Sequence, residues 1–207
     1  NGGSGGSSGM LVFSSGSSST GNSGLINIGT GASTAGRGGE VVISVGSGTS
    51  GSGGFLSAHA GRSTVTTGGS LSLDSGEGTA TTSGDVFIRS VNGGTSGGSG
   101  MLVFSSGIST AGNSGDIRIG SGAATKGRSG GIMVSVGSGT SGSGGMLIAK
   151  AGRSILNTGG GLLLSSGEGT TTTSGSISVR SVNAGSSGNS GMLVFSSGVS
   201  STGNSGS

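Results

Sequence analysis

The phrase Gly-Met-Leu-Val-Phe-Ser-Ser-Gly occupies residues 9–16 and returns unchanged at residues 100–107 and 191–198. The two intervals are both 91 residues long. Exact return of an eight-residue phrase at a fixed spacing is typical of tandem-repeat proteins, in which one structural unit recurs along the chain. This phrase therefore defines the period with which the rest of the sequence can be aligned.

The 91-residue interval divides the chain into long repeats. Residues 9–99 and 100–190 form two complete repeats, residues 191–207 begin a third, and residues 1–8 correspond to the end of a preceding one. We therefore expect residues 1–207 to form a single continuous segment of a longer array.

A shorter unit lies inside the long repeat, because one Gly stands immediately before every apolar cluster. These glycines follow one another at intervals of 15 residues, with one interval of 16 closing each long repeat, so six short units make one long repeat. We number this Gly as position 0 of its unit. The glycines are Gly9, Gly24, Gly39, Gly54, Gly69, Gly84, Gly100, Gly115, Gly130, Gly145, Gly160, Gly175, Gly191 and Gly206.

The apolar residues of each unit alternate in the manner of a strand. Position 2 is always aliphatic, as at Leu11 and Leu102, and position 4 is apolar, as at Phe13 and Phe104. Residues two apart lie on the same face of a strand. Position 7 is Gly in nearly every unit, which suits a corner that needs positive φ or a close approach of two backbones. The pattern predicts one short strand per unit.

The rest of each unit is rich in Ser, Thr and Gly, which disfavour a helix and suit a second, returning strand. The sequence therefore predicts an all-β fold, a β-solenoid with about 15 residues per coil, six coils per 91-residue repeat and a flattened two-sheet cross-section. Residues one coil apart would then stack in columns. This stacking would pair Arg62 with Glu77, and Arg153 with Glu168 one long repeat later.

Positions 1 and 3 should face outward in such a solenoid, yet many of them are apolar. An outward apolar strip usually marks an interaction surface. We call the residues below the strip and predict that they mediate lateral assembly with other copies of the chain. They are Met10, Val12, Phe55, Phe87, Met101, Val103, Met146, Ile148, Met192 and Val194.

The composition argues against an enzyme. The chain has 55 Gly among 207 residues, no Cys, and a single histidine, His59, whose counterpart 91 residues on is Lys150. We therefore predict no catalytic, cofactor-binding or metal-binding residues and no cofactor. Nine cations with only 2% aromatic residues argue against nucleic acid, and no apolar run is long enough for a membrane span. The many Ser and Thr residues leave room for O-linked glycans.

Several phrases carry a family resemblance. They are Asn-Ser-Gly-x-Ile-x-Ile-Gly-x-Gly at residues 22–31, Gly-Arg-x-Gly-Gly from residue 36, the Gly/Ser-rich run at residues 45–54, and Ser-Gly-Glu-Gly-Thr at residues 75–79. In these phrases the chain resembles very large Gly/Ser-rich tandem-repeat proteins of diatoms and related stramenopile algae. The resemblance implies a secreted or cell-surface location.

Two function hypotheses follow. The first is a structural repeat protein that forms an extracellular filament, wall or adhesive fibre, with rods associating laterally and end to end. The second is a surface-binding solenoid, either an adhesin stalk or an ice- or mineral-binding rod that uses its Ser/Thr face. The second resembles insect β-helical antifreeze proteins, but it lacks their Cys residues and their paired Thr columns.

Overall fold

The structure is a computed structural model that describes residues 6–206. The chain divides into two units, Asn1–Val103 and Phe104–Ser207. The boundary falls inside the apolar phrase at residues 100–107, so it does not coincide with the start of a long repeat. Each unit is described by itself below.

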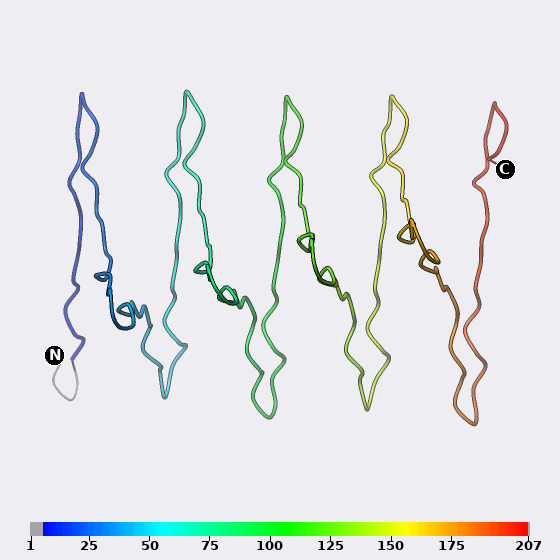
Figure 1. Ribbon diagram of the computed structural model, residues 1–207, viewed down its shortest axis with the longest axis horizontal. Coiled ribbons are helices and arrows are strands. Elements are labelled where there is room, and N and C mark those ends of the chain that lie inside the picture. The colour runs from blue at the N-terminus through cyan, green and yellow to red at the C-terminus, as the bar shows by residue number, and fades with distance from the viewer. Residues whose placement is uncertain (1–5, 207) are drawn as a thin grey trace. The chain divides into compact units, whose positions relative to one another are not determined.

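Residues 6–206 contain no helix and no β-strand, so the predicted all-β solenoid is wrong (Figure 1). The flattened two-sheet cross-section and the stacked 15-residue coils are wrong with it. Backbone hydrogen bonds within the described residues join groups three or eight residues apart and form no ladder between successive units. The chain is an irregular coil that repeats its local conformation.

The absence of a core explains this outcome. No side chain in the described range is buried, and the large apolar side chains range from 45% exposed at Val45 to fully exposed at Ile108 and Val199. Ordering a residue costs about 1–2 kcal/mol of backbone entropy, which burial of apolar surface must offset. Short apolar clusters separated by Gly, Ser and Thr supply little surface to bury, so composition outweighs the strand-like alternation.

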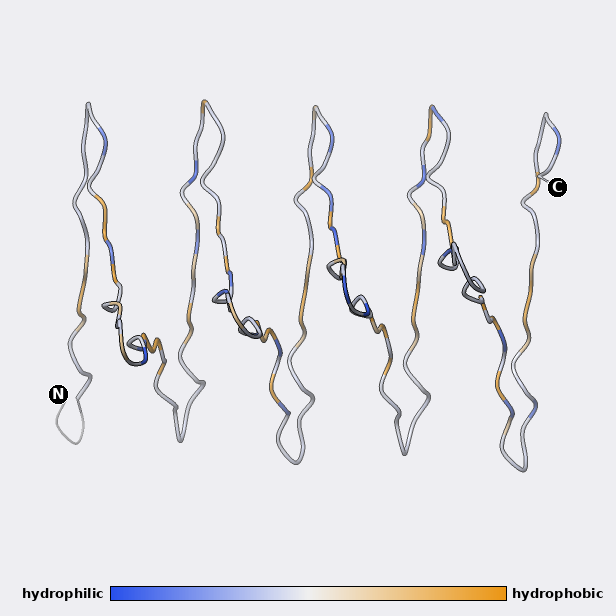
Figure 2. Cartoon of the chain, viewed as in Figure 1, coloured by the Kyte–Doolittle hydropathy of each residue, from blue (hydrophilic) through white to orange (hydrophobic). Residues whose placement is uncertain are grey.

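The repeating element is an extended run followed by a closed loop. Positions 0 to 7 form the run, which carries the apolar cluster, and the seven residues that follow, or eight in the 16-residue units, turn back until the next position 0 meets position 6 (Figure 1). Colouring by hydropathy separates the two parts, because the apolar stretches lie on the runs and most of the loop residues are pale (Figure 2). The unit is therefore a local structure of about fifteen residues.

The predicted charge columns do not form. Between residues 6 and 206 the one ion pair joins Arg118 to Asp116 at 3.0 Å, two residues apart in the same run, and both side chains are largely exposed. Arg62 and Glu77 form no ion pair there, because no sheet brings successive units into register.

Over residues 6–206 no helix has the length and apolar character needed to cross a bilayer.

Candidate functional site

All ten strip residues are exposed, from 62% at Val194 to 89% at Met10. The residues predicted to face inward are exposed as well, because position 2 lies between 48% at Leu102 and 62% at Leu162, with Leu11 higher still. The two faces of the run therefore differ only in how large a fraction of their apolar side chains is exposed. Every apolar residue of the run is available to a partner.

The loops close at a contact between small residues, which we call the neck. Each neck consists of position 6 of one unit and position 0 of the next, nine residues later, or ten in the 16-residue units. A Cβ placed on Gly39 would lie 2.7 Å from the Cβ of Thr30, and one on Gly145 would lie 2.7 Å from Cγ1 of Val136. At these two necks a Cβ at position 0 would force the facing side chain to shift, whereas at Gly115 it would make an ordinary contact, 3.8 Å from the Cβ of Ser106.

Four necks are also joined by a backbone hydrogen bond. The N–H of position 0 donates to the carbonyl of position 7 eight residues earlier, at 2.8 Å from Gly69 to Gly61 and 2.9 Å from Gly160 to Gly152. The same bond joins Gly84 to Gly76 and Gly175 to Gly167. The role of position 7 in these necks is thus close backbone approach. Among the described residues, positive φ occurs at Gly16 alone, with φ of 86°.

A turn at positions 9 to 12 forms the far end of the loop in the 15-residue units, and in the 16-residue units the turn lies one position later. In five units the Ser hydroxyl at position 9 accepts a hydrogen bond from the backbone N–H of position 12. The distance is 3.0 Å from Gly112 to Ser109 and 2.8 Å from Gly203 to Ser200. Ser side chains commonly stabilise turns in this way.

In some of the units that carry Gly at position 9, the turn brings backbone close to that Gly. A Cβ on Gly169 would lie 2.5 Å from the carbonyl oxygen of Thr173, and one on Gly78 would collide with that of Thr82. Gly139, at the same position, has no heavy atom within 4 Å of such a Cβ. The five partly covered residues of the described range all lie in necks or turns: Ser63, Gly78, Ser106, Ala151 and Gly169.

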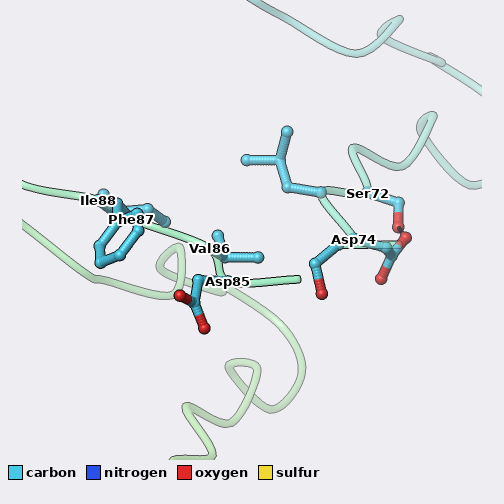
Figure 3. A pocket seen from close by; sticks show the side chains of 8 residues that line it. Ser72, Asp74, Asp85, Val86, Phe87 and Ile88 are labelled. Carbon is cyan, nitrogen blue, oxygen red and sulfur yellow. Dashed lines mark hydrogen bonds between the residues drawn. The ribbon is translucent and has the colours of Figure 1, made fainter. Parts of the chain in front are cut away.

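A shallow depression of about 490 Å³ lies between residues 72–75 and 85–88 and carries two carboxylates, Asp74 and Asp85 (Figure 3). Asp74 accepts a 2.5 Å hydrogen bond from Ser72, and Ser occupies both equivalent places, 165 and 176, of the next long repeat. Within residues 6–206 no three side chains of His, Cys, Asp or Glu gather closely enough to hold a metal ion. The depression therefore lies between two successive units, and its pair of carboxylates does not recur in the second long repeat.

Within residues 6–206 the His59 ring has one hydrogen-bond partner. Its ring hydrogen bonds with the hydroxyl of Ser57, at 2.8 Å to Nδ1, and both residues are exposed. The equivalent places in the next long repeat hold Ile148 and Lys150. The Ser57–His59 pair thus does not recur in the second long repeat.

Two small depressions do recur with the long repeat. Arg89, Ser90, Val91 and Asn92 line one of about 190 Å³, and residues 180–183, with the same Arg-Ser-Val-Asn sequence, line one of about 210 Å³. Both lie at positions 5 to 8 of a 16-residue unit, where the run ends and the loop begins and where Val replaces the usual Gly at position 7. The 16-residue units therefore differ from the 15-residue units in the local structure where the run meets the loop.

Comparison with known proteins adds nothing to the geometry. Neither a family model, nor a curated protein, nor a solved structure matches the chain. The function must therefore be argued from the exposed runs, the necks and the turns.

Proposed function

We propose that the chain is a non-catalytic structural protein of an extracellular or cell-surface filament, wall or adhesive fibre, in which copies associate through their apolar runs. The observation that carries this proposal is the regular exposure of those runs. Met101, Met146 and Met192 are each at least 79% exposed, and the surrounding run leaves no apolar side chain buried.

Association with another copy would remove this surface from water. Burial of apolar area contributes about 25 cal/mol per Å², so a well-covered Met or Phe contributes about 1.5–3 kcal/mol. Single contacts of this size are weak, but the runs recur in every unit. Once one run is bound, its neighbours are held close to equivalent runs, and the weak contacts add up. A second copy is the partner that repeats with the same period.

The surface-binding alternative depended on a flat solenoid face with a Ser/Thr column. Residues 6–206 form no sheet, so a face of that kind has no support and we propose only the self-associating function. The exposed hydroxyls of the loops remain acceptors for O-linked glycans, which would keep the loops hydrated between associated runs.

Two matched variants test the proposal. The run variant replaces Met10, Phe55, Met101, Met146 and Met192 by Ser. The loop variant replaces five equally exposed apolar residues of the loops by Ser: Val65, Ile108, Ile155, Leu156 and Val199. Light scattering and sedimentation velocity over a concentration series then report the concentration at which each protein assembles.

We expect the native chain to assemble and the run variant to require at least about a tenfold higher concentration, since each 1.4 kcal/mol of lost affinity is tenfold. The loop variant should assemble within about twofold of the native chain. A native chain that stays monomeric at all concentrations would refute self-association. Equal loss in both variants would show that the runs have no special role.

A further inference from the structure

Asn92 and Gly93 form a candidate modification site in the loop of the first 16-residue unit. An Asn followed by Gly can lose its side-chain amide without an enzyme, because the peptide nitrogen of the next residue can attack the side-chain carbonyl carbon. The attack requires a backbone free to adopt the ring geometry and a next residue with no Cβ in the way. Both conditions can be checked at this site.

No backbone hydrogen bond holds the Gly93 nitrogen away from the Asn92 side chain within the described residues. Asn92 and Gly93 are exposed and belong to no helix or strand, and the Gly93 N–H has no backbone acceptor within the described range. Arg89 lines the same small depression as Asn92. A carboxylate created at residue 92 would therefore arise close to a guanidinium that has no ion-pair partner between residues 6 and 206.

The second long repeat supplies a natural control. Asn183 occupies the equivalent depression beside Arg180, but the next residue is Ala184 instead of Gly. The turn that follows is also slightly looser, with 3.4 Å from the Gly188 nitrogen to the Gly185 oxygen against 3.2 Å between Gly97 and Gly94. The two sites thus share their local sequence and differ at the residue that controls the attack.

We propose that Asn92 is a site of spontaneous deamidation and that Asn183 reacts much more slowly. The Gly93 N–H gives its proton to solvent, its nitrogen bonds to the Asn92 side-chain carbonyl carbon, and the side-chain nitrogen leaves as ammonia. Water then opens the resulting five-membered imide at either carbonyl and leaves Asp or isoaspartate at residue 92. No electrons are transferred, and water is the one co-reactant. The formal net charge of the chain falls by one from +3.

The consequence is a chain that changes with age much faster at Asn92 than at the equivalent Asn183 of the second complete long repeat. The new carboxylate pairs with Arg89, and an isoaspartyl linkage adds one main-chain carbon to a loop whose backbone passes against Gly93. A Cβ at Gly93 would lie 2.5 Å from the Gly97 carbonyl oxygen. The added main-chain atom must therefore loosen this loop.

The test follows the two sites in the full chain incubated at neutral pH. Cleavage after Arg gives one peptide, residues 90–118, that contains Asn92 and Asn113, and another, residues 181–207, that contains Asn183. Fragmentation mass spectrometry distinguishes Asn from its acidic products at each place. Asn113, which precedes Ser114, serves as a control within the first peptide.

We expect Asn92 to convert about tenfold faster than Asn183 and Asn113, which corresponds to about 1.4 kcal/mol in the barrier. The reciprocal variants Gly93→Ala and Ala184→Gly should exchange the two rates. Equal rates at residues 92 and 183 in the native chain would overturn the proposal, and so would a rate at Asn92 that Gly93→Ala leaves unchanged. Neither variant depends on a folded core, because the described chain has none.

Discussion

At the scale of single residues, the structure depends on where a Cβ fits. Gly169 and Gly139 both occupy position 9 of their units. A Cβ on Gly169 would meet the Thr173 carbonyl oxygen at 2.5 Å and its carbon at 2.8 Å, whereas one on Gly139 would meet nothing within 4 Å. Sterics thus explain why position 9 is Gly at residue 169, but they do not explain it at residue 139.

This contrast gives a matched pair of variants. Gly169→Ala should open the turn at residues 169–172, because the obstacle is backbone and cannot rotate away. Gly139→Ala should leave its turn intact, since the space is open. Backbone chemical shifts around each site measure the change. Similar shifts for the two variants would contradict the described turn.

A second prediction concerns the Ser hydroxyls of the turns. Ser109→Ala removes the acceptor of the Gly112 N–H. For an exposed hydrogen bond we take the lower end of the usual range, about 0.5 kcal/mol, so amide exchange at Gly112 should rise about twofold. Ser109→Thr keeps the hydroxyl and should restore the native rate. An unchanged rate in Ser109→Ala would show that the hydroxyl does not hold the turn.

At the scale of the element, the fifteen-residue unit is marginal by itself. Closing a loop of eight residues costs about 2 kcal/mol in chain entropy before any constant term. The neck bond from Gly69 to Gly61 contributes about 0.5–1.5 kcal/mol. Because the two terms are similar in size, we expect the closed and open forms of such a loop to be close in free energy.

The sequence predicted the period of this element but not its conformation. The glycines at positions 0 and 7 marked the right places, and Gly61 and Gly69 do approach each other closely as one interpretation of position 7 required. The alternation at Leu11 and Phe13 predicted a strand and was wrong, because alternation selects a strand only where a core exists to receive one face. The Ser turns were missed, although Ser at position 9 recurs in six units.

At the scale of the whole molecule, the absence of a core from the described residues determines how the chain responds to heating. Cooperative unfolding and its heat-capacity change both come from exposing buried apolar surface. Within residues 6–206 no side chain is buried. Loss of the loops on heating therefore exposes almost nothing new to water.

The dilute chain should accordingly show no cooperative melting. We expect differential scanning calorimetry to record no unfolding peak, and far-ultraviolet circular dichroism to lack helix and strand bands. Ellipticity should drift smoothly with temperature. A sharp calorimetric transition in monomeric protein would contradict the described structure. One that appears only above the assembly concentration would support burial of the runs between copies.

The strip illustrates what local sequence can and cannot establish. Met101 and Val103 were singled out because a solenoid would expose them, and they are exposed, but Leu102 between them is 48% exposed as well. A side chain can be assigned to an inner or an outer face only where two layers pack together. The apolar run can be recognised from sequence, whereas its partner has to be found by measuring association.

Each closed neck shortens the end-to-end distance of the chain segment between its two ends. Gly61 and Gly69 are held 2.8 Å apart from carbonyl oxygen to nitrogen, while eight extended residues span about 26–29 Å. Tension that breaks this one bond releases roughly 25 Å of slack without breaking a covalent link, and relaxation allows the loop to close again. A fibre made of such chains would yield in small reversible steps under load and dissipate work at each one.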